Sequence, residues 1–204
     1  MSKRNILLSI IAVVTVLLLG STNAWSATIT TAASGNWSST STWTGGAVPT
    51  ATDDISIGAH TITIDQNVTI NNITFTGAGA IQPASTGTYT ITVTGNVDLT
   101  NLGDIVYSNG TGRLNIVFAG TSAQTVTLVE AANGTNGFNV NDLTFNNGTS
   151  VTFSGNFGQY VYGDLTLVGN ATVTVGAYNA GKTLTVHGIN STITVPTTAS
   201  LTLS

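Results

Sequence analysis

The chain alternates apolar and small polar residues with a period of two over most of its length, and this pattern limits the folds open to it. From residue 60 onward the alternation runs through stretches such as HTITID, TYTITVTG, ATVTVG and STITVP. Successive side chains of a strand point to opposite faces, so this alternation predicts strands with one buried face. Val, Ile, Thr and Phe fill these stretches, and Gly, Asn, Asp and Ser fill the gaps between them. The sequence therefore predicts an all-β fold.

The last third of the chain repeats a short unit. The copies read DLTFNNGTSVTFSG, DLTLVGNATVTVGA and TLTVHGINSTITVP, followed by an incomplete SLTLS. Each unit is read as two short strands joined by an Asn/Gly turn. A unit of about this length cannot bury its apolar face alone, so the repeat predicts a parallel β-solenoid, or β-helix, with coils of about 17–22 residues. The leading leucines are Leu143, Leu165, Leu184 and Leu201, and the second strands carry Val151, Val173 and Ile193.

Stacked coils predict the direction of individual side chains. We expect Leu165 and Leu167 to point inward and Thr166 to point outward, with like residues above one another in successive coils. About eight or nine coils, spaced about 4.8 Å apart, would make a rod about 40 Å long. A β-sandwich with long hairpins has a similar alternation and is the alternative fold.

The N-terminal segment, residues 1–27, has the layout of a secretory signal peptide. Lys3 and Arg4 precede an apolar run over residues 6–19, and small and polar residues follow it. We expect cleavage after Ala24, Ser26 or Ala27, no membrane insertion of the mature chain, and a secreted or cell-surface location. An uncleaved N-terminal anchor is the alternative. The expected layout is therefore a signal peptide (1–27), an N-terminal cap and first coil (28–59), and solenoid repeats (60–204) that stop in mid-repeat, as in a chain truncated at its C-terminus.

Charge excludes two classes of partner. Only 6% of residues are charged, and loss of the signal peptide would leave Arg113 and Lys182 as the cations beside eight acids. Nucleic acids and anionic membrane surfaces both require a basic surface to neutralise phosphates, so neither is an expected partner. The chain has no cysteine, which excludes disulfides and leaves packing and hydrogen bonds to stabilise it.

The opening of the mature chain, NWSSTSTWTGGAVPTATDDISI, reads as a cap over the first coil. Trp37 and Trp43 are large enough to cover the open end of an apolar stack. Pro49 shapes the following turn, and Asp53 and Asp54 precede the first strand.

This order of residues resembles the start of the extracellular domain named for its eight glycines, over about residues 34–75. The repeats at residues 139–204 are similar to those of bacterial secreted β-strand-repeat proteins, and the looser likeness extends over the mature chain. Both resemblances imply a β-solenoid surface or adhesin-like protein, and neither supplies a catalytic residue. The residues that match the first family are Trp37, Trp43, Gly45, Gly46, Pro49, Asp53, Asp54 and Asp65.

Few residues are candidates for metal binding. Asp53, Asp54 and Asp65 carry oxygens suited to calcium, but they lack the spacing of a known calcium loop, and turn capping is the simpler interpretation. His60 and His187 are the only histidines and belong to no His/Cys cluster. We expect no metal and no cofactor.

Two alternatives concern function. A β-helix polysaccharide lyase or glycosidase needs positioned carboxylates, and Asp142 and Asp164 occupy equivalent repeat positions that favour a turn role instead. An ice-binding protein would present an outward ladder of hydroxyls, although threonine is also the usual outward residue of strands. The candidate ladder is Ser150, Thr152, Thr172, Thr174, Thr192 and Thr194.

The sequence as a whole favours a non-catalytic stalk, adhesin or matrix module. Low charge and faces rich in Thr, Asn and Ser suit contact with carbohydrate, with other surface polymers, or with neighbouring copies of the chain.

Overall fold

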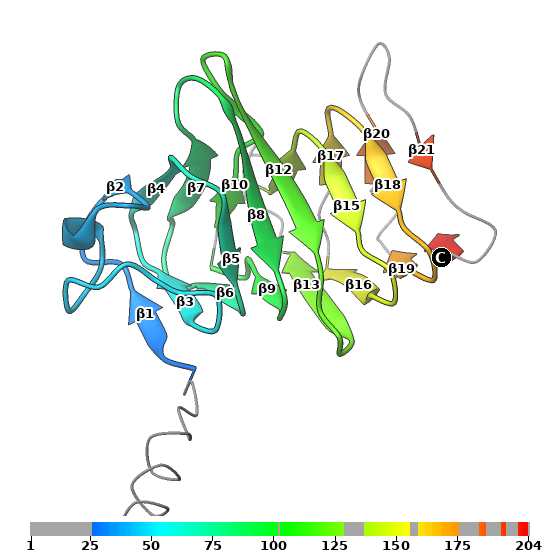
Figure 1. Ribbon diagram of the computed structural model, residues 1–204, viewed down its shortest axis with the longest axis horizontal. Helices are drawn as coiled ribbons and strands as arrows, with labels where there is room; N and C mark the ends of the chain where they lie inside the picture. The colour runs from blue at the N-terminus through cyan, green and yellow to red at the C-terminus, as the bar shows by residue number, and fades with distance from the viewer. Residues whose placement is uncertain are drawn as a thin grey trace, which may run out of the picture.

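The computed structural model is a parallel β-solenoid that winds through about six turns (Figure 1). It describes residues 26–101, 103–128, 137–155, 159–175, 184–186, 193–194 and 200–203. Apart from β11 and β12, all strand pairs in this part of the chain are parallel, as a solenoid requires and a hairpin sandwich does not. The predicted all-β solenoid is thus confirmed.

Each full coil contributes one strand to each of three sheets, which we call sheets 1, 2 and 3. Sheet 1 contains β1 (Thr28–Thr30), β3 (Asp54–Ile57), β6 (Ile73–Phe75), β9 (Val97–Asp98), β13 (Gln124–Leu128), β16 (Ser150–Gly155), β19 (Thr172–Val175) and β22 (Ser200–Leu203). Sheet 2 contains β2 (Gly35–Asn36), β4 (Thr61–Ile64), β7 (Ala80–Pro83), β10 (Asp104–Ile105), β14 (Phe138–Val140), β17 (Gln159–Val161) and β20 (Leu184–Val186). Sheet 3 contains β5 (Val68–Ile70), β8 (Thr88–Val93), β12 (Gly112–Phe118), β15 (Leu143–Phe145), β18 (Leu165–Leu167) and β21 (Ile193–Thr194), with β11 (Ser108–Asn109) beside β12.

The period of two determines which side chains face inward. In β12 buried residues alternate with partly exposed ones along the whole strand. Leu165 and Leu167 are buried and Thr166 is partly exposed, as expected from the repeat. The inward residues of successive coils stack in register, as Ile91, Ile116 and Leu143 do in sheet 3.

Some coils are longer than the repeat predicted, and there are fewer of them. The coil that runs from Ile55 to its register partner Ile73 is short, but the coil from Val97 to its partner Val126 is much longer. Coil length therefore varies more widely than expected, and the number of turns is about six rather than eight or nine. The reason is that a coil has three strands, whereas the sequence repeat showed two.

The third strand also changes part of the predicted alignment. Leu143 pairs with Leu165, and Val151 pairs with Val173, as expected. Leu184 instead pairs with Gln159 in sheet 2. Ile193 takes the place next to Leu165, and Leu201 the place next to Val173.

The interior is a continuous apolar column whose composition changes along the rod. Isoleucine dominates the first coils, which hold one core phenylalanine, Phe75, and four more phenylalanines gather in the middle coils. Phe118 stacks on Phe145 with ring centroids 5.4 Å apart, and Phe153 packs edge-on against both rings. Edge-on and offset contacts of this kind are the favourable arrangements of aromatic pairs.

The segment after β2 covers the N-terminal end of the column (Figure 1). It contains one 3-10 turn, η1 (Thr40–Thr42). Trp37 and Trp43 are buried and pack edge-to-face with centroids 4.8 Å apart. The Trp43 Nε1–H donates to the Trp37 carbonyl oxygen over 2.8 Å, which satisfies the indole donor within the cap. Pro49 is also buried in this segment.

Some predictions fall on parts of the chain outside the described residues. They include nearly all of the predicted signal peptide, together with Lys182, His187 and Thr192. Within the described residues, no helix has the length and hydropathy needed to cross a membrane.

Candidate functional site

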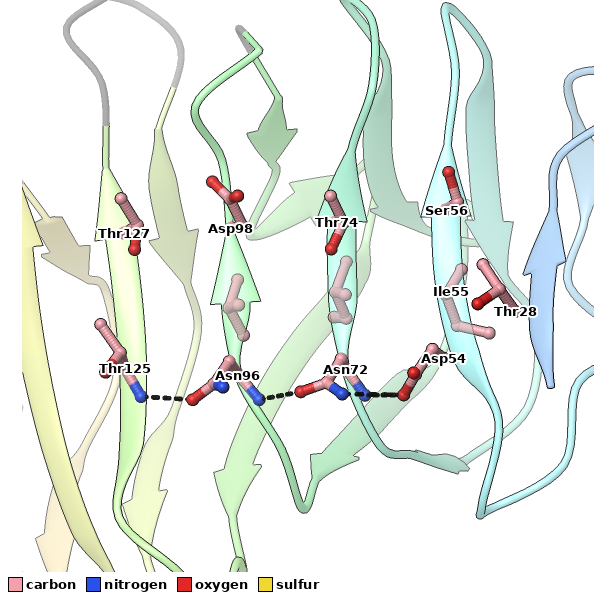
Figure 2. A pocket seen from close by; sticks show the side chains of 12 residues that line it. Thr28, Asp54, Ile55, Ser56, Asn72, Thr74, Asn96, Asp98, Thr125 and Thr127 are labelled. Atoms are coloured by element: carbon pink, nitrogen blue, oxygen red, sulfur yellow. Dashed lines mark hydrogen bonds between the residues drawn. The ribbon is translucent and has the colours of Figure 1, made fainter. Parts of the chain in front are cut away.

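The outward face of sheet 1 holds two parallel rows of polar side chains (Figure 2). They line a shallow hollow of about 500 Å³ over the first coils. Register explains the rows, because residues that pair between neighbouring strands stack on the same face. The first row is Asp54, Asn72, Asn96 and Thr125, and the second row is Ser56, Thr74, Asp98 and Thr127.

The first row is a chain of side-chain acceptors for backbone N–H groups. Asp54 Oδ1 accepts hydrogen bonds from the backbone N and the Nδ2 of Asn72, at 3.2 and 2.8 Å. Asn72 Oδ1 accepts from the Asn96 backbone N at 2.6 Å, and Asn96 Oδ1 accepts from the Thr125 backbone N at 2.7 Å. Each side chain therefore caps the N–H of the equivalent residue in the next coil.

The same device recurs at the other two sheets. In sheet 3 the Asn67 side chain caps Thr90, and the Asp142 side chain caps Asp164, both at 2.9 Å. In sheet 2 the Asp104 side chain caps Gly137 at 3.0 Å. We call these side chains coil-to-coil acceptors. They stand immediately before an inward apolar residue, and each accepts a hydrogen bond from a backbone N–H of the next coil.

The three aspartates considered for calcium have separate partners. Asp53 accepts from the backbone N and Oγ1 of Thr50 and from the Ala27 backbone N. Burial acts to raise the pKa of Asp53, but these hydrogen bonds outweigh it and lower the pKa below its usual value. Asp65 instead accepts from the backbone N and Oγ of Ser38. Across the described residues no group of three potential metal ligands occurs.

His60 lies at a corner between sheets 1 and 2. Its Nδ1 is 2.9 Å from Thr31 Oγ1, which also accepts from the Gly58 backbone N. The contact joins the first two coils, and the partner of His60 in it is the uncharged hydroxyl of Thr31.

Asp142 and Asp164 lie on neighbouring coils of sheet 3, directly before the paired Leu143 and Leu165. Glycosidases place two carboxylates on opposite sides of a sugar ring. Asp142 and Asp164 instead stack on the same face, and the Asp142 carboxylate accepts a hydrogen bond from the Asp164 backbone N.

The sheet 1 face carries two more carboxylates, Asp54 and Asp98. They are two coils and two residues apart in register, which corresponds to about 12 Å between their Cα atoms. Each of the two carboxylates has its own partners, since Asp54 accepts from the amides of Asn71 and Asn72 and Asp98 accepts from the Thr100 backbone N.

Part of the predicted hydroxyl ladder is stacked. Ser150 pairs with Thr172, and Thr152 pairs with Thr174, on the outward face of sheet 1. The third predicted pair does not continue the ladder, since Thr194 pairs with Thr166 in sheet 3. Ser200 and Thr202 occupy the next position instead. The misplacement follows from the unrecognised third strand, which shifts the last repeat to a different sheet.

Two kinds of residue did not stand out in the sequence. The amides Asn72 and Asn96 looked like ordinary turn residues, although their position directly before Ile73 and Val97 is a usable signal. None of the tyrosines stood out either, yet Tyr107 and Tyr162 stack on each other in the fold. Their sequence separation hides this contact.

Comparisons of the chain with protein-family models, with curated proteins and with solved structures found no match.

Proposed function

We propose that the chain is a non-catalytic β-solenoid module of an exported or cell-surface protein, and that it contacts carbohydrate or similar neutral surface polymers. The observation that carries this proposal is that six aspartate carboxylates accept hydrogen bonds from backbone N–H groups. An aspartate that caps a backbone N–H is held in place and partly occupied, so it is poorly suited to moving protons. The aspartates that accept a hydrogen bond from a backbone N–H are Asp53, Asp54, Asp65, Asp98, Asp104 and Asp142.

The outer faces support the carbohydrate part of the proposal. The two rows on sheet 1 offer hydroxyl, amide and carboxylate groups along a shallow hollow of about 500 Å³. Such groups exchange hydrogen bonds with sugar hydroxyls, and the low charge of the chain favours a neutral polymer over an anionic one.

Binding and turnover measured together test the proposal. The purified chain is expected to be retarded in native gels that contain a soluble neutral polysaccharide, while a reducing-end assay on the same polysaccharide stays at background. Release of reducing or unsaturated sugars that is lost in both Asp142→Asn and Asp164→Asn would contradict it and favour the enzyme. The Asp65→Asn variant is the matched control, since its carboxylate contacts Ser38 and lies outside both the sheet 1 rows and the Asp142–Asp164 pair.

Ice binding is a second candidate because threonines stack on sheet 1. Thr125, Thr152 and Thr174 pair in register on three successive coils. The earlier coils carry Asp54, Asn72 and Asn96 in that row, so the described threonine array covers only part of the face. Thermal hysteresis that disappears in Thr152→Leu and persists in Thr166→Leu, on sheet 3, would favour ice binding over the carbohydrate proposal.

A further inference from the structure

Three tyrosines gather where sheet 2 turns toward sheet 3. Tyr107 follows β10, Tyr160 lies in β17, and Tyr162 follows β17. The rings of Tyr107 and Tyr162 are stacked, with centroids 3.6 Å apart and an interplanar angle of 14°. Tyr160 lies 6.3 Å from Tyr162 at 35°. All three side chains are partly exposed, and we call them the tyrosine platform.

The stacked pair lies on the outer surface of the solenoid. The strands β10 and β17 both pair with β14, one on each side of it. Their backbones are therefore two strand spacings apart, about 9.6 Å. Rings that start from these two coils and meet at 3.6 Å must lean toward each other across the intervening coil. All three residues are partly exposed, so the tyrosine platform lies at the surface next to sheet 2.

Amides border the platform, and the Asp142 carboxylate lies beside Gly163, next to Tyr162. Asn139 pairs with Tyr160 in register, and both are partly exposed. Asn141 Nδ2 donates to Asn115 Oδ1 over 3.0 Å. Burial raises the pKa of the Tyr162 phenol, and the neighbouring Tyr107 and Tyr160 raise it further, so the phenol stays neutral in ordinary buffers.

The positively charged side chain among the described residues contributes little to binding at the platform. Arg113 is the cation among the described residues, and its guanidinium donates to the carbonyl oxygens of Gly110 and Gly112. An anionic ligand would therefore meet aromatic rings and amides without a counter-charge. This excludes phosphate-rich and acidic polymers as the natural fit to the platform.

Size argues against a folded protein as the occupant. A stable protein interface buries about 800 Å² on each partner. Three tyrosines that are each mostly covered expose well under about 500 Å² together. A sugar ring is small enough, and it combines an apolar face of C–H groups with a rim of hydroxyls.

We propose that the tyrosine platform binds a neutral polysaccharide, with pyranose rings packed on Tyr160 and Tyr162 and with sugar hydroxyls hydrogen-bonded to the amides of Asn139 and Asn141. This inference rests on the proposed function, and it adds a carbohydrate contact at one corner of the solenoid to the surface formed by the rows on sheet 1. Aromatic faces exclude water beneath the sugar, and the amides on the same surface determine its orientation.

Affinity electrophoresis of the whole chain tests the assignment. The gels contain a soluble β-1,4-glucan, a β-1,3-glucan or a galactomannan. Tyr160→Ala and Tyr162→Ala should each weaken retardation by about tenfold, the usual consequence of truncating an aromatic contact at the centre of a binding site. Tyr160→Phe and Tyr162→Phe keep the ring and should bind like the parent. Thr44→Ala, exposed in the N-terminal cap and outside both the platform and the sheet 1 face, is the matched control, and circular dichroism checks that each variant is folded.

The outcomes separate this inference from the broader function. Binding that survives both alanine variants but is lost on changing the sheet 1 rows would overturn the tyrosine assignment and leave the proposed function intact. Loss of binding in the phenylalanine variants would also overturn it, because stacking would then not be the basis. No retardation of the parent chain by any of the three polysaccharides would contradict the carbohydrate part of both proposals. A change of oligomeric state in the alanine variants, measured by light scattering, would assign the platform to contact between copies and overturn the inference.

Discussion

Gln124 is a buried polar side chain that hydrogen-bonds both within its own coil and to the coil before it. Its Oε1 accepts from the Gly120 backbone N over 2.9 Å. Its Nε2 donates to the carbonyl oxygens of Val93 and Gly95, at 3.2 and 2.5 Å. Gly95 and Gly120 lie at a corner outside the strands, whereas the Val93 carbonyl also accepts from the Ala119 backbone N. The Gln124 side chain therefore completes hydrogen bonding that the sheets leave open at Gly95 and Gly120.

Replacing Gln124 by leucine should lower the free energy of unfolding by about 2–3 kcal/mol, because buried backbone groups lose their partners. Urea denaturation followed by circular dichroism measures the change. Gln82→Leu is the matched control, since Gln82 is partly exposed and makes a long contact of 3.4 Å with Thr63, and it should stay within about 0.5 kcal/mol of the parent. An equal loss in both variants would contradict the role assigned to Gln124.

Asp104 should make the stability of the protein depend on pH. Burial raises its pKa above the ordinary 3.8, and the hydrogen bond from the Gly137 N–H offsets this only in part. Between 3.8 and the raised value the folded protein holds more protons than the unfolded chain, so the free energy of unfolding falls as the pH rises through that window. The full penalty is present at neutral pH.

The Asp104→Asn variant keeps an acceptor for Gly137 and removes the charge. It should therefore be more stable than the parent at pH 7 and nearly equal to it at pH 3, as measured by thermal melting at both values. A variant that is less stable than the parent at pH 7 would show that the charged carboxylate stabilises the fold.

At the scale of strands, the coil-to-coil acceptors join each coil to the next and help set the register. Asn96 is exposed, and its side chain caps the Thr125 N–H in the coil above. Asn96→Ala should lower the free energy of unfolding by about 0.5–1 kcal/mol, as loss of a helix cap does in an exposed position. Asn96→Asp keeps an acceptor oxygen and should recover most of that loss in the same urea titration. If aspartate destabilises as much as alanine, capping is not what Asn96 contributes.

How far the sequence predicts this fold can be judged strand by strand. Alternating strands such as β12 and β19 were predictable because their inward and outward residues differ in polarity. The strand β17, QYV, is too short to show a period, and missing it placed Leu184 and Thr194 in the wrong sheets. The capping role of Asp53 and Asp142 follows from turn chemistry that the sequence displays. The tyrosine platform depends on which coils become neighbours, so local pattern could not predict it.

The whole molecule is a rod in which each coil contacts mainly the coils beside it (Figure 1). Stability in such a stack is a sum of neighbouring interfaces, so the two ends need not unfold together. The tryptophans of the cap, Trp37 and Trp43, lie at the N-terminal end and report on that end alone. Far-UV circular dichroism, in contrast, reports on all coils.

Leu165 is buried in β18, several coils away from the cap. Leu165→Ala should remove about 2–5 kcal/mol from the coils around it and lower the urea midpoint seen by circular dichroism. The midpoint seen by tryptophan fluorescence should move much less, in a Trp25→Phe background that leaves only the cap tryptophans. Ile55→Ala, beside the cap, is the matched core truncation and should shift the fluorescence midpoint most. If the coils are only weakly coupled, weakening one end should separate the urea midpoints seen by circular dichroism and by fluorescence. Coincident midpoints in both variants would mean instead that the rod unfolds as one cooperative unit.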